Sequence, residues 1–292
     1  MNKIKIMTDS ACDIPKELEE QLDIKILNFA VTVGDDSYLE RVDFTDKEFY
    51  DILLSSPKIP STSQITTMQF YDEYKKLYDE GYSEVIYVSI NQKGSATHDN
   101  ALFARKNLFE KHKEIEANFK IHIIDSKTYT MAYGYPVMMA AKKAKNGSSS
   151  SEIVSYLKEY FDSVVVYFSP LKLDFAKKSG RISCAAAFVG ELLGLKPVIR
   201  IKDGEMEIVE KVRGEKALIT TLINYAKQDM IPKTEYILLK GMNEAEPILF
   251  NEQTKKAFSY EAMGTYNVGA AIAINAGPNL IGIIVKGKNR TK

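Results

Sequence analysis

The sequence is poor in tryptophan, histidine and cysteine: its 292 residues include no Trp, three His and two Cys. Cys12 and Cys184 lie far apart and have no further cysteine at metal-binding spacing, which predicts free thiols in a reducing cytoplasm. No segment approaches the roughly 20 apolar residues that a membrane-spanning helix needs, which excludes stable membrane insertion. Because Lys plus Arg and Asp plus Glu number 39 each, the net charge of zero gives no long-range attraction to nucleic acid.

The sequence also lacks the common catalytic motifs. Neither nucleotide-binding pattern, G-x-G-x-x-G after the first predicted strand or G-x-x-x-x-G-K-[ST], is present, nor is the hydrolase pattern G-x-S-x-G. Asp9 and Asp13 are two isolated carboxylates without a histidine, which does not define a metal site. His112 and His122 favour surface or structural positions, whereas His98 is either a ligand contact or a solvated helix residue. We therefore predict a protein that is not an enzyme and has no metal or cofactor.

Strands that alternate with helices dominate the first half of the chain. The predicted strands Lys3–Thr8, Glu84–Ser89 and Lys120–Asp125 are separated by helical segments. Such crossover connections imply a parallel sheet. The length of the chain favours two domains.

The second half has a different pattern. Asp203-Gly204 lies between two strand-like segments, which predicts an antiparallel hairpin. We predict an α/β fold of two domains, with a parallel-sheet α/β domain at residues 1–161 and an α+β domain with an antiparallel sheet at residues 162–292. We expect a ligand cleft at the junction of the two domains.

Short polar motifs follow the predicted strands of the first half. They are Thr8-Asp9-Ser10, Thr62-Ser63-Gln64, Gly94-Ser95-Ala96-Thr97 and Asp125-Ser126. Ligands of open parallel sheets bind at the carboxyl ends of the strands, and hydroxyls beside helix N-termini suit a carboxylate or phosphate. For each motif alone, a helix cap is the commoner role, because Ser and Thr favour helix starts. Four such motifs at one edge of a sheet favour a ligand site.

Three features of the second half have two interpretations each. Arg181 follows a glycine that ends a predicted helix, and it is either a carboxylate or phosphate ligand or a surface cation near a helix C-terminus. Asn275 begins the turn Asn275-Ala276-Gly277-Pro278-Asn279, where its amide either reaches a bound polar group or shapes the turn. The small and apolar residues at 184–194 either pack in the core or leave room for an apolar ligand.

In their order along the chain, these motifs resemble those of the DegV family. The motifs are Thr8-Asp9-Ser10 with Asp13, Thr62-Ser63-Gln64, Ser95-Ala96-Thr97, Asp125-Ser126, Ser179-Gly180-Arg181-Ile182-Ser183, Lys211-Val212-Arg213-Gly214 and Gly277-Pro278. The resemblance covers about residues 4–286. It implies a bacterial protein of two α/β domains that buries the acyl chain of a long-chain fatty acid and holds its carboxylate near the domain junction. Some members are the acyl-binding subunit of a fatty acid kinase, in which a separate ATP-dependent subunit phosphorylates the carboxylate for phospholipid synthesis.

The resemblance also implies roles for single residues. Thr62 and Ser95 would hydrogen-bond the carboxylate, with Ser63 and loop amides such as that of Ala96 nearby. Arg181 matches the arginine that the family places near the ligand mouth and the kinase partner. The fatty acid would be the only bound group, and a fatty acid kinase catalytic subunit the expected protein partner.

The sequence departs from the family pattern at two places. Asn275 stands where the family has a histidine before its Gly-Pro-Gly turn, which begins here at Gly277. Ser95-Ala96-Thr97 replaces the usual Ser-Gly-Thr, and His98 replaces a common aromatic residue. Asn275 still donates from an amide, so acyl binding can survive, whereas phosphorylation of the bound acid is less secure.

Two other functions use the same residues. One is an enzyme or binding protein for a small phosphorylated metabolite held by the strand-end hydroxyl loops, which a short, wet and basic pocket would favour. The other is a regulatory module in which bulky side chains block a vestigial pocket. The sequence does not determine acyl chain length, unsaturation or oligomeric state.

Overall fold

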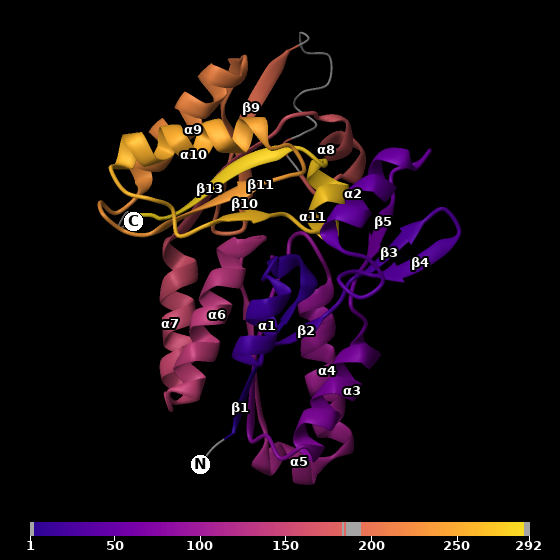
Figure 1. The fold of residues 1–292 in the computed structure, drawn as a ribbon. Coiled ribbons are helices and arrows are strands. Elements are labelled where there is room, and N and C mark those ends of the chain that lie inside the picture. The colour runs from indigo at the N-terminus through magenta and orange to yellow at the C-terminus, as the bar shows by residue number, and fades with distance from the viewer. Residues whose placement is uncertain (1–2, 183, 185–193, 289–292) are drawn as a thin grey trace. The chain divides into compact units, whose positions relative to one another are not determined.

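The chain folds into two units, whose bounds differ from the predicted domains at residues 31–61 (Figure 1). The computed structural model describes residues 3–182, 184 and 194–288. One unit comprises Met1–Ala30 and Thr62–Phe161, and the other comprises Val31–Ser61 and Asp162–Lys292. The predicted domains, residues 1–161 and 162–292, are therefore wrong over residues 31–61.

The first unit is built on a four-stranded parallel sheet in the order β2-β1-β6-β7. The strands are β1 (Ile4–Asp9), β2 (Lys25–Leu27), β6 (Glu84–Ser89) and β7 (Lys120–Asp125). Every residue of β6 is buried, as expected for a central strand covered on both faces. The predicted parallel-sheet α/β architecture is confirmed.

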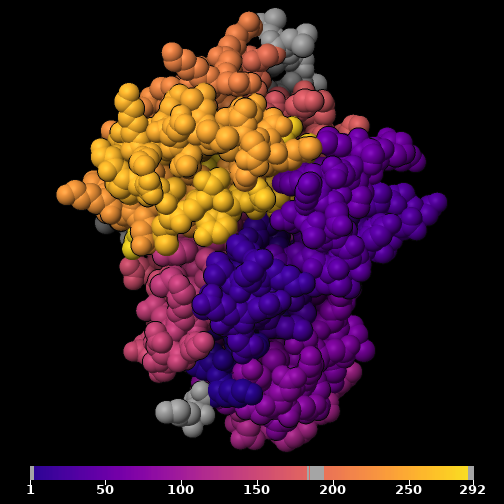
Figure 2. Space-filling model, viewed as in Figure 1, coloured from indigo at the N-terminus to yellow at the C-terminus, as the bar shows by residue number. Residues whose placement is uncertain are grey.

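Helices cover both faces of this sheet. They are η1 (Ser10–Cys12), α1 (Lys16–Leu22), α3 (Thr67–Asp79), α4 (Thr97–Lys111), α5 (Lys113–Asn118), α6 (Met131–Lys145) and α7 (Ser150–Ser163). Figure 1 shows α6 and α7 on one side of β1, and α3 and α4 on the other. The indigo surface of α1 adjoins the magenta surface of α6 (Figure 2).

Helix α6 approaches the end of β1 very closely. A Cβ atom at Gly134 would lie 2.2 Å from the carbonyl oxygen of Cys12. Only glycine permits this approach, which places α6 directly against the loop that follows β1.

Three helices of the described residues begin with capping boxes. One is α7, where Ser149 N donates to Glu152 Oε2 at 2.8 Å and Glu152 N donates to Ser149 Oγ at 3.3 Å. In α2 (Asp46–Ser55), Glu48 N donates to Thr45 Oγ1 at 3.3 Å and Thr45 N donates to Glu48 Oε2 at 2.8 Å. The sequence pattern Thr45-Asp46-Lys47-Glu48 predicts such a box, and the structure confirms it. Helix α3 has a third box, formed by Thr66 and Gln69. Thr66 therefore caps α3, and the hydroxyls of Ser61–Ser63 do not.

The second unit contains a six-stranded sheet in the order β10-β9-β8-β13-β11-β12. The strands are β8 (Val164–Pro170), β9 (Leu195–Lys202), β10 (Glu205–Arg213), β11 (Tyr236–Lys240), β12 (Thr265–Asn267) and β13 (Leu280–Lys286). All pairs are antiparallel except β11 with β12. Asp203 and Gly204 join β9 to β10 with φ of 51° and 80°, as a two-residue hairpin turn requires. The predicted antiparallel sheet and its hairpin are confirmed.

Helices α9 (Glu215–Asp229) and α10 (Ala245–Phe258) cover one face of this sheet (Figure 1). Alternate residues of β8, Val165 and Tyr167, belong to the apolar core of this unit, as do Leu218 and Leu222 of α9. This alternation is that of a strand with one face against helices. The short helices α8 (Asp174–Ser179) and α11 (Ala270–Ala276) pack on each other elsewhere in the unit.

Residues 31–61 join the second unit through long-range hydrogen bonds. The segment carries β3 (Ala30–Val33), β4 (Asp36–Leu39) and α2, and with β5 (Ser61–Ser63) it forms a sheet in the order β4-β3-β5. Tyr50 Oη donates to Val268 O at 2.6 Å, and Ala271 N donates to Glu40 Oε1 at 2.7 Å. These contacts join residues more than 200 positions apart, so no local pattern announces them.

Over residues 3–182, 184 and 194–288, no helix is long and apolar enough to cross a membrane. Of the run of small and apolar residues at 184–194, only Cys184 and Gly194 are among the described residues, and Ser183 lies outside them as well.

Candidate functional site

Thr62 and Ser63 lie on the short strand β5, where the sequence predicted a loop. Thr62 is half-buried and Ser63 is exposed. Just beyond them, Ile65 O accepts a hydrogen bond from Asn100 Nδ2 at 2.8 Å, and Thr67 Oγ1 lies 3.3 Å from Asn100 Oδ1. Asn100, on the first turn of α4, thereby ties this segment to the start of that helix.

Ser95 and Ala96 directly precede α4. Ala96 is the N-cap residue and provides no side-chain cap. Ser95 Oγ accepts a hydrogen bond from Thr97 N at 3.3 Å and lies 2.8 Å from Thr97 Oγ1. Thr97 is buried and Ser95 is half-buried. Because one bond between two hydroxyls uses only one of their protons, the pair retains a proton that can bond to a ligand.

The predicted loops before α3 and α4 therefore open two neighbouring helices. The two helices lie side by side (Figure 1), and the side chain of Asn100 joins them at their N-terminal ends. Neutral hydroxyls and the positive end of the α4 dipole can bind a carboxylate without a charged side chain. Asn100 was not predicted, because a single amide on a helix has no recognisable pattern.

The side chains of the Thr8-Asp9-Ser10 motif form hydrogen bonds with other residues of the protein. Asp9 is fully buried and accepts hydrogen bonds from Tyr133 Oη at 2.6 Å, Ile90 N at 2.8 Å and Tyr87 Oη at 3.0 Å. Burial raises the pKa of Asp9 to about 6, against the effect of these donors. Ser10 Oγ accepts from Phe29 N at 3.0 Å. These side chains hold the loops at the sheet edge.

The side chains of Asp125 and Ser126 also form hydrogen bonds with the backbone of the neighbouring loops. Asp125 Oδ1 accepts hydrogen bonds from Lys127 N at 2.9 Å and from Gln92 N at 3.1 Å. Ser126 Oγ donates to Thr128 O at 3.2 Å. Two of the four predicted polar motifs thus brace the strand-end loops.

His98 is buried on the first turn of α4, where the sequence left a ligand contact or a solvated position open. Its Nδ1 lies 2.9 Å from Ser89 Oγ. Burial lowers the pKa of His98, which favours the neutral imidazole. The other two histidines bond to carboxylates, His112 to Glu114 and His122 to Glu84.

In the second unit, Arg181, Asn275 and Gly277 lie around the α8–α11 contact. Ser179 Oγ donates to Asn275 O at 3.2 Å and thereby links the two helices. Arg181 is exposed, and its Nη1 donates to Ser179 O at 2.8 Å. The amide of Asn275 donates to Ala271 O at 2.7 Å, and Gly277 has a φ of 95° that favours glycine.

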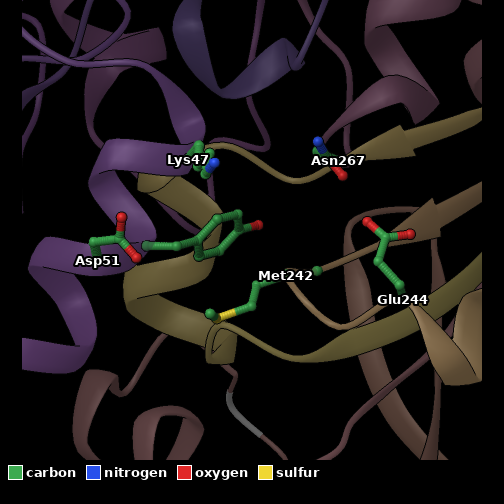
Figure 3. Close-up of a pocket in the computed structure, with 7 residues that line it drawn as sticks. Lys47, Asp51, Met242, Glu244 and Asn267 are labelled. Carbon is green, nitrogen blue, oxygen red and sulfur yellow. The ribbon is translucent and has the colours of Figure 1, made fainter.

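Each unit also contains a pocket lined by other residues. In the second unit, a cavity of about 310 Å³ lies between α2, the loop after β11 and the end of β12 (Figure 3). Its lining residues are Lys47, Tyr50, Asp51, Gly241, Met242, Glu244 and Asn267. In the first unit, a cavity of about 490 Å³ adjoins the start of β1 and the end of α6. It lies at the sheet edge opposite to the strand ends that carry the polar motifs.

Among the described residues, no group of three or more His, Cys, Asp or Glu side chains could hold a metal ion. Neither Cys12 nor Cys184 forms a disulfide bond.

Known proteins match this chain from end to end. The family model described as "Uncharacterised protein, DegV family" matches residues 3–288. A DegV domain-containing protein of Clostridium acetobutylicum is 32% identical, and the match covers 97% of this chain and 98% of that protein. A stearic acid-binding protein from Eubacterium ventriosum is similar in structure, with a TM-score of 0.85, 25% identity and coverage of 98% and 99%. DegV of Bacillus subtilis, described as a fatty acid binding protein, has a TM-score of 0.82, 26% identity and coverage of 99% and 100%.

Proposed function

Because this chain belongs to the DegV family, we propose that it binds a long-chain fatty acid and acts by binding, with no catalytic role of its own. The observation that carries the proposal is the match of nearly the whole chain to structures described as stearic acid-binding and fatty acid binding. Burial of the acyl chain would supply the affinity, at about 0.8 kcal/mol for each CH₂ removed from water. The fatty acid would be a ligand and not a cofactor.

We assign the carboxylate of the acid to the loops before α3 and α4. A buried carboxylate is costly unless donors satisfy it. Half-buried Thr62 and exposed Ser63 each carry a hydroxyl. The Ser95–Thr97 pair retains a hydroxyl proton that can bond to the carboxylate. The backbone N–H of Ala96 lies at the N-terminus of α4, where the helix dipole favours a negative charge. All these donors are neutral, so the acid is held without an ion pair that would slow its release.

Within the second unit, we assign Asn275 and Gly277 to ligand binding. Asn275 takes the place of the family histidine, and one of its amide protons is already used by Ala271 O. Its second amide proton is the one we assign to the ligand. The positive φ of Gly277 shapes the turn that follows α11.

Presentation of the bound acid to a separate kinase subunit is the finer part of the proposal. Arg181 is exposed at the end of α8, and its guanidinium bonds to Ser179 O through Nη1. An arginine in this state can form further bonds to a carboxylate or phosphate of a partner. Formation of acyl phosphate from ATP, the bound acid and the catalytic subunit would test this step, and loss of product with Arg181→Ala is expected. Cysteines without a disulfide bond fit the reducing cytoplasm in which such a reaction would take place.

Mass spectrometry of lipid extracted from the purified protein tests the main proposal. We expect a long-chain fatty acid at about one molecule per chain. Repeated recovery of no acyl ligand would refute the proposal, and recovery of a small phosphorylated metabolite would support the alternative use of the same loops.

Thr62→Val tests the site while keeping the shape of the side chain. We expect the variant to fold and to retain less fatty acid. Thr265→Val is a matched control, because Thr265 is an exposed residue of the three-residue strand β12. If the wild type and Thr62→Val retain equal amounts of fatty acid, the assignment of Thr62 to the binding site is wrong.

A further inference from the structure

We infer that Tyr129 is a positioning residue for the proposed fatty-acid site and holds the loop Asn91–Ala96 in the conformation that presents Ser95. The inference rests on the proposed function for its ligand. Tyr129 follows β7 and belongs to none of the polar motifs, so the sequence offered no reason to single it out.

The ring of Tyr129 lies directly against the loop that it would position. Asn91 Nδ2 donates to Tyr129 Oη at 3.1 Å. A Cβ atom at Gly94 would lie 2.6 Å from Tyr129 Oη and 3.0 Å from its Cε1, so the ring end occupies the space that any other residue at position 94 would need. Gly94 N in turn donates to Asn91 O at 2.9 Å and closes the turn.

Further bonds join the same loop to the segment that carries Tyr129. Asn91 N donates to Thr128 O, and Gln92 N donates to Asp125 Oδ1, each at 3.1 Å. Ser95 follows Gly94 without an intervening residue and is bonded to Thr97 at the start of α4. A displacement of the Gly94 turn is therefore passed directly to Ser95.

The segment that carries Tyr129 keeps an unfavourable conformation. Lys127 has a φ of 56°, and Thr130 has a φ of 58° with a ψ of −148°, a region that residues other than glycine rarely adopt. The hydroxyls of Thr128 and Thr130, which are 2% and 4% exposed, have no hydrogen-bond partner among the described residues. Strain and unsatisfied buried groups persist where the surroundings impose a conformation, and they are typical of functional sites.

Binding of radiolabelled stearate to Tyr129→Phe tests the role of the hydroxyl. The variant keeps the ring and loses the bond from Asn91. We expect the Kd for stearate to rise about 3- to 10-fold, the range produced by loss of one hydrogen bond. Tyr71→Phe is the matched control, because its hydroxyl lies 3.2 Å from His112 at the C-terminal end of α4, and its Kd should equal that of the wild type. A Kd of Tyr129→Phe within twofold of the wild type would overturn the inference.

A double-mutant cycle tests whether Tyr129 acts through the loop. The added methyl of Gly94→Ala would displace the ring of Tyr129 and weaken stearate binding. In a Tyr129→Ala background the same change meets no ring, so it should cause no further loss. Independent effects of the two substitutions on the Kd would contradict the coupling.

Amide hydrogen exchange separates this inference from the proposed function. If the wild type binds no stearate, the proposed function fails, but the positioning role can still be measured in the ligand-free protein. Faster exchange at residues 92–96 in Tyr129→Phe than in Tyr71→Phe would support it. Unchanged exchange at these amides would refute it whether or not stearate binds.

Discussion

Substitution of Asp9 by asparagine should remove the part of the pH dependence of stability that comes from this carboxyl. Asp9 is fully buried, and burial raises the pKa of its carboxyl from 3.8 to about 6. A carboxyl with a raised pKa favours the folded state when it is protonated. Its contribution is therefore fully present below pH 3.8 and is lost as the pH rises through 6.

The difference between the two pKa values sets the size of the effect. It corresponds to about 3 kcal/mol of lost stability at a pH well above 6, because one pKa unit is about 1.4 kcal/mol. Between pH 5 and pH 7.5, the linkage relation leaves about 1.5 kcal/mol of this change. The free energy of unfolding of the wild type should fall by that amount relative to Asp9→Asn over this range.

Urea unfolding followed by circular dichroism at pH 5.0, 6.0 and 7.5 measures this difference. Tyr87 and Tyr133, the other titratable side chains that bond to Asp9, have pKa values raised well above 10 by burial, so they stay protonated over this range. Asp35→Asn, an exposed turn residue, controls for the loss of one carboxylate. Parallel stability curves for the wild type and Asp9→Asn would show that Asp9 is ionised without cost in the folded protein and would refute the reasoning.

Three further substitutions test the packing of the two units. Tyr50→Phe removes the 2.6 Å bond to Val268 O and should cost about 1 to 3 kcal/mol in unfolding free energy by urea titration, because a buried carbonyl loses its donor. Gly241→Ala places a Cβ atom 2.1 Å from Pro278 O, so the backbone must shift, and we expect a fall in melting temperature with broadened NMR signals from the β11–α10 loop. Thr66→Ala removes the cap of α3 and should cost about 1 kcal/mol, measured by the same urea titration. An unchanged unfolding free energy for Tyr50→Phe would mean that the bond to Val268 O does not stabilise the attachment of residues 31–61.

Local sequence patterns predicted the elements that local chemistry determines. The hairpin at Asp203-Gly204 requires two positive φ values, and this pair of residues adopts them readily. The capping box at Thr45 likewise involves only neighbouring residues. The alternation of strands and helices was enough to predict the parallel sheet of the first unit.

The assignment of residues 31–61 could not be predicted in this way. The position of this segment depends on Tyr50 and Glu40, whose hydrogen-bond partners lie more than 200 residues away in the chain. Pairing with β3 makes a strand of Ser61–Ser63, although a proline and three hydroxyl residues favour a loop. Tertiary contacts override local preference at these positions.

The polar motifs at the strand ends look alike in the sequence, but in the structure their side chains bond to different groups. Asp9 and Ser10 accept from backbone and tyrosine donors, and Asp125 accepts from two loop amides. Ser95 Oγ instead bonds within its own helix start, to Thr97, and Ser95 and Thr62 are half-buried. Composition cannot make this distinction, since a hydroxyl or carboxylate at a helix start serves either purpose equally well.

A binding site made of neutral donors is selective only if its donors are held in fixed positions. A hydroxyl offers one weak, rotatable donor, so its affinity for a carboxylate depends on its position more than on its charge. The carboxylate oxygens of buried Asp9 and half-buried Asp125 accept from the amides of Ile90 and Gln92, and thereby fix the loop that leads to Ser95. Removal of either carboxylate should therefore reduce stability and ligand binding together, whereas removal of the Ser95 hydroxyl should reduce ligand binding alone. The inner residues provide rigidity, and the outer residues can then bind and release an acid without a charged partner.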